Sequence, residues 1–144
     1  VLPDTLKTIG DGAFADCRNI HSINIPKGVT YISNTSFDGV DTTAIALNVK
    51  VGKTKLNQAK RKGKKLTIRW KKTADAKGYV VYRSTKKNGG YKKVKTISKA
   101  SVCKFSQKAK KLKKNRKYYY KVKVYKVVLG KKYFSGFSNV KAVR

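Results

Sequence analysis

The sequence predicts a mainly β protein made of two unlike parts, a set of short repeated coils followed by a seven-stranded antiparallel β-sandwich. Three observations support this prediction. The first part repeats itself at an offset of 23 residues. The second part alternates apolar and polar side chains in short runs that are separated by turn residues, which is the pattern of half-buried strands. The net charge of +31 comes entirely from this second part.

The first part contains two copies of one motif. Leu2-Pro3 aligns with Ile25-Pro26, and Phe14 aligns with Phe37. A period in the twenties with regularly spaced apolar residues is typical of coils that bury their apolar faces on one another. The second copy departs from the first because Ala13, Cys17 and Ile20 are replaced by Ser36, Val40 and Thr43. We therefore expect the second copy to be a capping coil.

The first copy, from Leu2-Pro3 through Ile9-Gly10 and Ala13-Phe14 to Cys17, resembles the BspA-like leucine-rich repeats of bacterial surface proteins. The resemblance implies short strands joined by helical segments, with Ala13-Phe14 and Cys17 directed inward. Two coils are fewer than the three or so that a solenoid normally needs. We therefore expect residues 1–46 to be the end of a longer array, and the chain to be a C-terminal piece of a longer protein.

Seven runs in the second part have the alternation of strands. Turn signals such as Asn88-Gly89-Gly90 and Gly130 separate them. The expected strands are Lys55–Lys60, Leu66–Trp70, Tyr79–Arg83, Tyr91–Ile97, Val102–Ser106, the run that begins at Tyr118, and Lys131–Arg144. Seven short strands of this kind predict an antiparallel sandwich.

The strand that begins at Tyr118 is the centre of this prediction. Its alternate residues are Tyr118, Tyr120, Val122 and Val124, and Leu112 precedes it across a polar turn. With Trp70, Gly78-Tyr79 and Gly136-Phe137-Ser138, this order resembles fibronectin type III domains, especially the Lys-rich ones in surface proteins of Gram-positive gut bacteria. The resemblance implies structural roles for Trp70, Leu112 and Tyr118, and a tyrosine corner in which the Tyr118 hydroxyl bonds to backbone upstream. The family often has Trp where this chain has Phe137.

The charge divides sharply along the chain. Residues 1–49 contain three basic and five acidic residues, whereas residues 50–144 contain 34 basic residues and a single acid, Asp75. Such a break in composition predicts a domain boundary. We expect a repeat domain over residues 1–46 and a sandwich domain over residues 50–144.

The inventory of reactive residues predicts no enzyme. The chain has no Glu, and Asp75 has no second carboxylate in its domain with which to perform acid–base or glycosidic chemistry. His21 is the only histidine, and neither Cys17 nor Cys103 belongs to a metal-binding or redox motif. No phosphate-binding or calcium-binding loop is present. We therefore expect no catalytic residues, no cofactor and no metal, and we expect both cysteines to be buried and inert.

One face of the sandwich is a candidate ligand surface. The outward residues of the central strand and its expected neighbour are Tyr82, Tyr119, Lys121, Lys123 and Tyr125. Aromatic rings beside lysines can stack on sugars or bases while the charges hold an anion. The alternative is an ordinary solvated face, since lysine alternates with β-branched residues on many exposed strands.

The strong positive charge predicts binding to anionic polymers. Lysines are spread around the whole sandwich, including Lys92, Lys93, Lys110, Lys111, Lys113, Lys114, Lys131 and Lys132. The first hypothesis is a non-catalytic adhesion or spacer module of a secreted or cell-wall-associated bacterial protein. Its partners would be teichoic acid, glycosaminoglycan, mucin or a host protein, and it would be monomeric and would not insert into a membrane.

Two other hypotheses remain open. One is a nucleic-acid-binding protein that uses the Lys/Tyr face, although no nucleic-acid reading motif is present and binding to nucleic acid is expected to be non-specific. The other is the accessory C-terminal region of a secreted hydrolase. The first and third hypotheses place the protein outside the cell.

Overall fold

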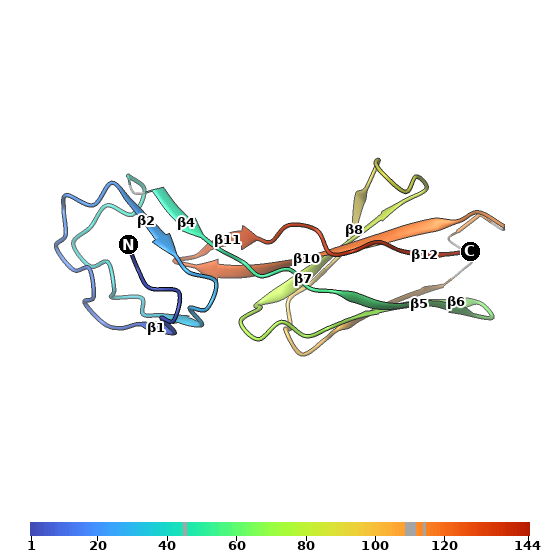
Figure 1. The fold of residues 1–144 in the computed structure, drawn as a ribbon, viewed down its shortest axis with the longest axis horizontal. Helices are drawn as coiled ribbons and strands as arrows, with labels where there is room; N and C mark the ends of the chain where they lie inside the picture. The colour runs from blue at the N-terminus through green and yellow to red at the C-terminus, as the bar shows by residue number, and fades with distance from the viewer. Residues whose placement is uncertain (45, 109–111, 114) are drawn as a thin grey trace.

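The computed structural model describes residues 1–44, 46–108, 112–113 and 115–144, and these residues form twelve β-strands. Figure 1 shows an elongated molecule with the repeat coils at one end and the sandwich at the other. The longest strand, β10 (Tyr118–Val128), runs from the sandwich toward the coils. The described residues contain no helix, so the prediction of a mainly β fold is confirmed.

The repeat coils stack through short parallel strands. β1 (Thr8–Ile9) pairs with β3 (Tyr31–Ile32), and Thr8 lies opposite Tyr31. β2 (Ser22–Ile25) pairs in the same way with β4 (Ala46–Val49). The partners Thr8 and Tyr31 are 23 residues apart, which is the offset of the sequence repeat. One turn of the coil therefore corresponds to one copy of the motif.

The core of the repeats comes from the apolar positions that recur in the two copies. Ile9, Ile25 and Val29 are buried together, and partly buried side chains pack against them, namely Leu2, Leu6, Phe14, Ile23, Ile32 and Val49. Phe14 and Phe37 stack with ring centroids 5.1 Å apart. Buried Ser36 replaces the alanine of the first copy, and its hydroxyl donates to the carbonyl of Gly10 at 2.7 Å.

The predicted helical segments of the repeats do not form. The backbone instead makes successive turns closed by bonds to the third residue back, such as Ala15 N–H to Gly12 O and Cys17 N–H to Phe14 O. Gly12 and Asp16 have positive φ angles of 63° and 55°, and a right-handed helix cannot continue through such residues. The prediction of a buried Cys17 is also wrong, because Cys17 lies just beyond this turn and is exposed.

The sandwich consists of two sheets. One holds β5 (Leu56–Lys62), β6 (Lys65–Trp70) and β9 (Lys104–Lys108) in the order β5-β6-β9. The other sheet has the order β11-β10-β7-β8, with β7 at Gly78–Ser84, β8 at Lys92–Ile97 and β11 at Lys131–Phe134. A further short strand of this sheet, β12 (Lys141–Val143), pairs with β10. All of these pairs are antiparallel. Three strands facing four, with the last strand divided in two, is the strand arrangement of a fibronectin type III sandwich.

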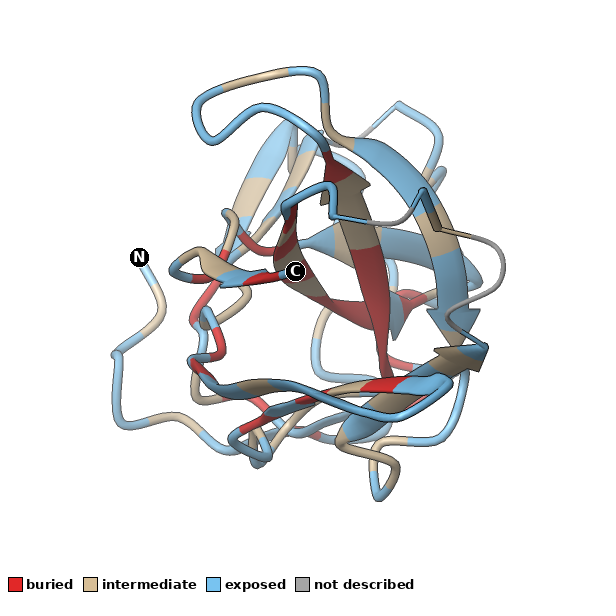
Figure 2. Cartoon of the chain, turned by 90° about the vertical axis from the view of Figure 1, so that its right-hand side faces the viewer, coloured by how far each residue is buried: buried red, intermediate tan, exposed pale blue. Residues whose placement is uncertain are grey.

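The core of the sandwich lies between the inner faces of the two sheets. Its fully buried side chains include Ile68 and Leu66 from β6, Tyr79 from β7, and Tyr120 and Val122 from β10. Figure 2 looks along the molecule from the sandwich end and shows buried residues concentrated on the central strands, with exposed residues on the loops. Alternation in the sequence therefore predicted correctly that these five side chains point inward.

The tyrosine corner has the geometry that the fibronectin type III resemblance implies. The Tyr118 side chain is buried, and its hydroxyl accepts a hydrogen bond of 2.9 Å from the backbone N–H of Lys113. Leu112 is partly buried against the sandwich core, and Trp70 is buried within it. The bond holds the chain that crosses from the three-stranded sheet to β10.

Replacing Tyr118 with phenylalanine is expected to lower the free energy of unfolding by roughly 1–3 kcal/mol, because the Lys113 N–H is left without its partner in a partly buried site. Tyr119→Phe is the matched control, since Tyr119 is the next residue on the opposite face of β10 and is not fully buried. It should change stability by less than about 0.5 kcal/mol. Urea unfolding of both variants checks this, and equal effects would show that the corner bond adds nothing to stability.

The two parts have separate hydrophobic cores, and the chain between β4 and β5 connects them. We expect residues 50–144 to fold alone, because their core is complete without the repeats. Residues 1–46 should not fold alone, because the buried cluster of their described part has only three apolar side chains, Ile9, Ile25 and Val29. Thermal melts of both pieces by circular dichroism test this, and a cooperative melt of residues 1–46 would contradict it.

Candidate functional site

The predicted ligand face lies on the outer side of the sheet that contains β7 and β10. β7 and β10 pair so that Tyr82 is opposite Lys121, and Val80 is opposite Lys123. Tyr82, Tyr119, Lys121 and Lys123 are all partly exposed there. The structure therefore brings four of the five predicted residues onto one face.

Tyr125, the fifth predicted residue, does not belong to this exposed face. It is 2% exposed, and its register partner on β7 is Gly78. A Cβ atom on Gly78 would lie 2.7 Å from the Tyr125 hydroxyl, so the tyrosine occupies space that only glycine leaves open. Phe134 packs beside the ring at 6.0 Å, and the Lys132 ammonium lies 5.0 Å from the ring centroid. The prediction of an outward, accessible Tyr125 is therefore wrong.

The chain between β11 and β12 adds an aromatic residue to the face. Ser135 and Ser138 are buried, and their hydroxyls accept the N–H groups of Val124 and Val122, each at 2.9 Å. Their own N–H groups donate to the carbonyls of the same two valines. The two serines thus satisfy the backbone groups of β10 where no regular strand pairs with it. The Phe137 ring between them lies on the outer face beside Lys123.

Three rings and two ammonium groups form what we call the aromatic-lysine cluster, namely Tyr82, Tyr91, Phe137, Lys121 and Lys123. The Phe137 ring contacts Tyr82 edge-on at 5.0 Å and lies 6.2 Å from Tyr91. The Lys121 ammonium lies 4.4 Å from the Tyr91 centroid, and the Lys123 ammonium lies 4.5 Å from the Phe137 centroid. Cation–π contacts of this kind contribute about 0.5–1 kcal/mol each at exposed sites.

The cluster's lysines therefore already contact its rings. A sugar or a base that stacked on Phe137 would have to displace Lys121 and Lys123, whose ammonium groups lie 5.1 and 4.5 Å from that ring. Sequence reasoning missed Tyr91 and Phe137. A usable signal for Phe137 was its place at the family's tryptophan position, but nothing in the local pattern showed on which face Tyr91 would lie.

Tyr91 in the cluster and Tyr120 on the inner face of β10 stay protonated at neutral pH. Burial, and next the nearby Tyr119, raises the pKa of Tyr91. On the inner face, burial raises the pKa of Tyr120 to about 12, although Arg83 opposes the shift. The Tyr120 hydroxyl accepts a bond of 3.1 Å from Gln107. Tyr91 is partly exposed and can contact a ligand, whereas Tyr120 is buried in the core, and both are poor general bases.

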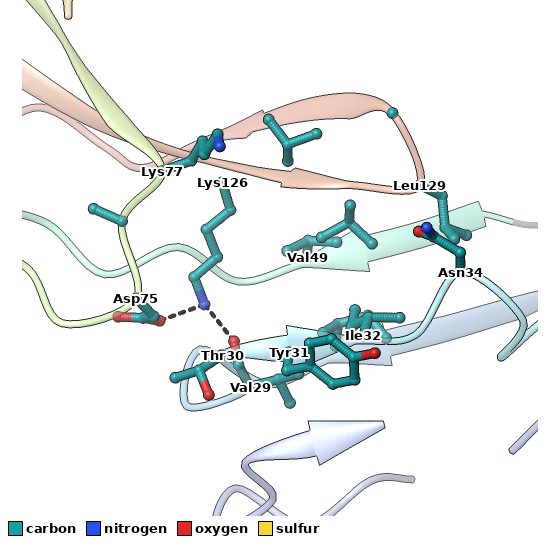
Figure 3. Close-up of a pocket in the computed structure, with 15 residues that line it drawn as sticks. Val29, Thr30, Tyr31, Ile32, Asn34, Val49, Asp75, Lys77, Lys126 and Leu129 are labelled. Atoms are coloured by element: carbon teal, nitrogen blue, oxygen red, sulfur yellow. Dashed lines mark hydrogen bonds and ion pairs between the residues drawn. The ribbon is translucent and has the colours of Figure 1, made fainter. Parts of the chain in front are cut away.

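The only acidic residue of the sandwich sequence, Asp75, forms an ion pair at the junction with the repeats. Asp75, in the β6–β7 connection, forms an ion pair with Lys126 of β10, and the two side chains are 12% and 7% exposed. The Lys126 ammonium also donates to two carbonyls of the repeat segment, Lys27 O at 2.7 Å and Val29 O at 3.0 Å. Figure 3 shows the lysine extending from β10 toward Asp75 and Val29. We call these contacts the Lys126 junction.

A cavity of about 280 Å³ lies beside the Lys126 junction. Side chains of the repeats, the β6–β7 connection and the β10–β11 turn line it, including Tyr31, Asn34, Val49, Lys77 and Leu129. Its lining has one carboxylate, Asp75, which is already paired. The arrangement fits a structural contact between the two parts and offers no pair of groups for acid–base chemistry.

Within the described residues, no group of three or more His, Cys, Asp or Glu side chains is placed to hold a metal ion. Cys103 is partly buried against the sandwich core, and its Sγ lies 3.7 Å from the Tyr79 hydroxyl. His21 is exposed at the edge of its coil. The same part of the chain contains no helix that is long and apolar enough to cross a membrane.

Residues 1–68 match the family model described as "BspA type Leucine rich repeat region (6 copies)". The repeat segment belongs to the BspA-type leucine-rich repeats. The match extends past the repeat strands into β5 and β6 of the sandwich. Comparison with curated proteins found no significant match.

Solved structures resemble this chain over about three fifths of its length. A β-1,2-glucanase from Parabacteroides distasonis is 24% identical, with a TM-score of 0.52, over 62% of this chain and 12% of that chain. Pectate lyase Pel3 from Pectobacterium carotovorum is 21% identical, with a TM-score of 0.51, over 65% of this chain and 27% of that chain. An Fn3-like protein from Clostridium thermocellum is 25% identical, with a TM-score of 0.48, over 62% of this chain and 85% of that chain. The likenesses to the glucanase and the lyase concern the fold.

Proposed function

We propose that this chain is a non-catalytic binding or spacer module of a secreted or cell-wall-associated bacterial protein, in which the basic sandwich attaches the repeats to anionic polymers. The combination of BspA-type repeats with a fibronectin type III sandwich suggests a surface or extracellular module. The polymers we propose are teichoic acid, glycosaminoglycan and mucin, and a host protein is the alternative partner. Nucleic acid would bind by the same electrostatics without sequence preference.

The charge distribution carries this proposal. Residues 50–144 contain 34 basic residues and one acid, and that acid is paired with Lys126 at the junction. The sandwich thus has almost no internal counter-charge, and its positive field must be balanced by ions or by a partner. The described lysines Lys92, Lys93, Lys113, Lys131 and Lys132 are exposed, whereas Lys110, Lys111 and Lys114 lie outside the described residues.

A non-catalytic role is supported by the state of the reactive groups. Asp75 is paired with Lys126, and Tyr91 and Tyr120, whose pKa values are raised, remain protonated at neutral pH. In the alternative hypothesis of an accessory region of a secreted hydrolase, the catalytic residues would belong to a separate domain of the same protein. Two of the similar folds belong to proteins named as a glucanase and a pectate lyase, but a shared fold does not transfer their activity.

Binding of the whole chain to immobilised heparin, teichoic acid and duplex DNA tests the proposed function. At low salt we expect the three dissociation constants to agree within about tenfold, because the interaction follows charge and not sequence or sugar identity. Tyr82→Ala and Tyr119→Ala should each change them by less than about threefold, since the charge that drives binding is unaltered. Weakened binding to one polymer alone in these variants would instead support a specific site on the outer face that carries Tyr82 and Tyr119.

A further inference from the structure

The outer face of the three-stranded sheet carries a regular array of cations. Strand register places three sets of residues side by side across β5, β6 and β9, namely Gln58-Arg69-Lys104, Lys60-Thr67-Ser106 and Lys62-Lys65-Lys108. The intervening residues Leu66, Ile68 and Trp70 are buried, so the three sets face outward. We call this surface the basic sheet face; its six cations are Lys60, Lys62, Lys65, Arg69, Lys104 and Lys108, and all are exposed.

This face differs from the aromatic-lysine cluster on the other sheet. There the ammonium groups of Lys121 and Lys123 lie against aromatic rings. On the basic sheet face the central residues are hydroxyls, and Thr67 and Ser106 bond to each other at 2.9 Å. Within the part of the chain that the structure describes, none of the six cations has an acidic partner. Its charges are therefore available to a ligand.

Without a ligand, repulsion between the lysines of the basic sheet face lowers the stability of the sandwich. Lys62, Lys65 and Lys108 lie directly opposite one another on adjacent strands, where side chains are about 5 Å apart. Like charges in such positions destabilise a sheet. A row of phosphate or sulfate groups lying across the strands would relieve this repulsion, because neighbouring strands are about 4.8 Å apart and alternate residues along a strand about 6.6 Å apart.

The face is also hollowed. A depression of about 280 Å³ lies on it, and one of about 660 Å³ lies at its β5–β6 hairpin end, where Gln107 of the inner face is also part of the lining. Both depressions are lined by Lys62 and Lys65. The larger adds Lys64 and Lys108, and the smaller adds Lys60 and Arg69. In Figure 1 the β5–β6 hairpin that carries Lys62 and Lys65 lies at the end of the molecule away from the repeats. A polymer held there would leave the repeats free to contact another partner.

We propose that a linear polyanion with separate phosphate or sulfate groups binds across the basic sheet face, centred on Lys62, Lys65 and Lys108. This inference rests on the proposed function and assigns it to one surface of the sandwich. Five of the six cations are lysines, which act as point charges and select neither phosphate nor sulfate by geometry. The expected ligand is therefore a linear polymer that carries separate anionic groups along its length. A wall teichoic acid and a sulfated glycan both have this chemistry.

The test compares two triple variants of the whole chain that remove the same charge. One is Lys62→Gln with Lys65→Gln and Lys108→Gln on the basic sheet face. The other is Lys92→Gln with Lys93→Gln and Lys95→Gln on β8 of the opposite sheet, where all three lysines are exposed. The probes are heparin and a glycerol-phosphate teichoic acid, titrated at salt concentrations from about 50 to 200 mM.

We expect the first variant to raise both dissociation constants at least tenfold at about 50 mM salt. The slope of log affinity against log salt should fall by about 3, one for each lysine that no longer neutralises an anionic group of the polymer. The β8 variant should change the constants by less than about threefold. Without polymer, the first variant should melt at a higher temperature than the parent chain, because repulsion is removed. Weaker binding of one probe only would support the site and identify phosphate or sulfate as its ligand.

Equally weakened binding in the two variants would overturn the assignment to the basic sheet face while leaving polyanion binding by overall charge intact. Absence of binding by the parent chain to either probe at about 50 mM salt would instead refute the proposed function itself. A first variant that melts below the parent chain and still binds both probes normally would contradict the argument from like-charge repulsion.

Discussion

Asp75→Asn is expected to destabilise the attachment of the repeats to the sandwich by about 3–5 kcal/mol, because it leaves a charged lysine buried without its carboxylate. Lys126 is 7% exposed on its side chain, and its remaining partners are the carbonyls of Lys27 and Val29. If residues 1–46 do not fold alone, this change should leave the repeats largely unfolded while the sandwich stays native. Circular dichroism and proteolysis of the repeats, followed together with Trp70 fluorescence, would measure it.

The isolated fragment 50–144 supplies a matched control. Without the repeats, the Asp75–Lys126 pair faces water, where ion pairs contribute only about 0–1 kcal/mol. Asp75→Asn should therefore cost the fragment less than about 1 kcal/mol. Adding Lys126→Met to Asp75→Asn in the whole chain should recover part of the stability, because no unpaired charge remains buried. A similar cost in the fragment and in the whole chain would show that the pair acts within the sandwich and not at the junction.

Trp70→Ala is expected to lower the free energy of unfolding of the sandwich by about 3–5 kcal/mol, as large-to-small changes at buried aromatic positions do. Trp70 is 3% exposed and packs edge-on against Tyr79 at 5.4 Å between the two sheets. The variant lacks tryptophan fluorescence, since Trp70 is the only Trp, so denaturant unfolding must be followed by circular dichroism. A decrease below about 1 kcal/mol would mean that the core collapses around the missing ring.

Trp70→Phe refines this prediction. The indole Nε1 is buried and has no hydrogen-bond partner among the described residues, so replacing the ring removes volume but no polar interaction. The expected cost is about 1–2 kcal/mol, well below that of Trp70→Ala. A cost equal to that of the alanine variant would show that the indole makes an interaction that phenylalanine cannot replace.

Much of the fold could be predicted from local sequence patterns. The parallel pairing of Thr8 with Tyr31 follows from the repeat offset, and the buried Tyr118, Tyr120 and Val122 follow from alternation along one strand. These features depend on periods that a single stretch of sequence displays. The helical segments were wrongly predicted because Gly12 and Asp16 adopt positive φ angles, and only the glycine signals this in the sequence.

The candidate face was harder to predict because it depends on contacts between distant segments. Alternation places Tyr125 outward, but its exposure is decided by Gly78, Phe134 and Lys132, which come from two other strands. Phe137 reaches the face because Ser135 and Ser138 replace backbone partners of β10. Neither serine has a local pattern that predicts this arrangement.

The seventh predicted strand, Lys131–Arg144, shows the same limit. It forms two short strands, β11 and β12, on either side of the segment that contains the serines. The Lys126 junction was also not predicted, since a single Asp in a Lys-rich sequence does not show which lysine it will meet. Sequence reasoning therefore predicted the sheets well and the positions of their side chains beyond the central strands less well.

The salt dependence of polyanion binding shows whether overall charge attaches the sandwich to polymers. The measurement is the affinity of the whole chain for heparin, teichoic acid and DNA as salt rises toward about 0.3 M, where the screening length is well under 10 Å. If charge attaches the sandwich to polymers, log affinity should fall linearly with log salt for all three, and binding should disappear for all three together. Binding to one polymer that resists salt, or no binding to any of them at low salt, would contradict attachment by overall charge.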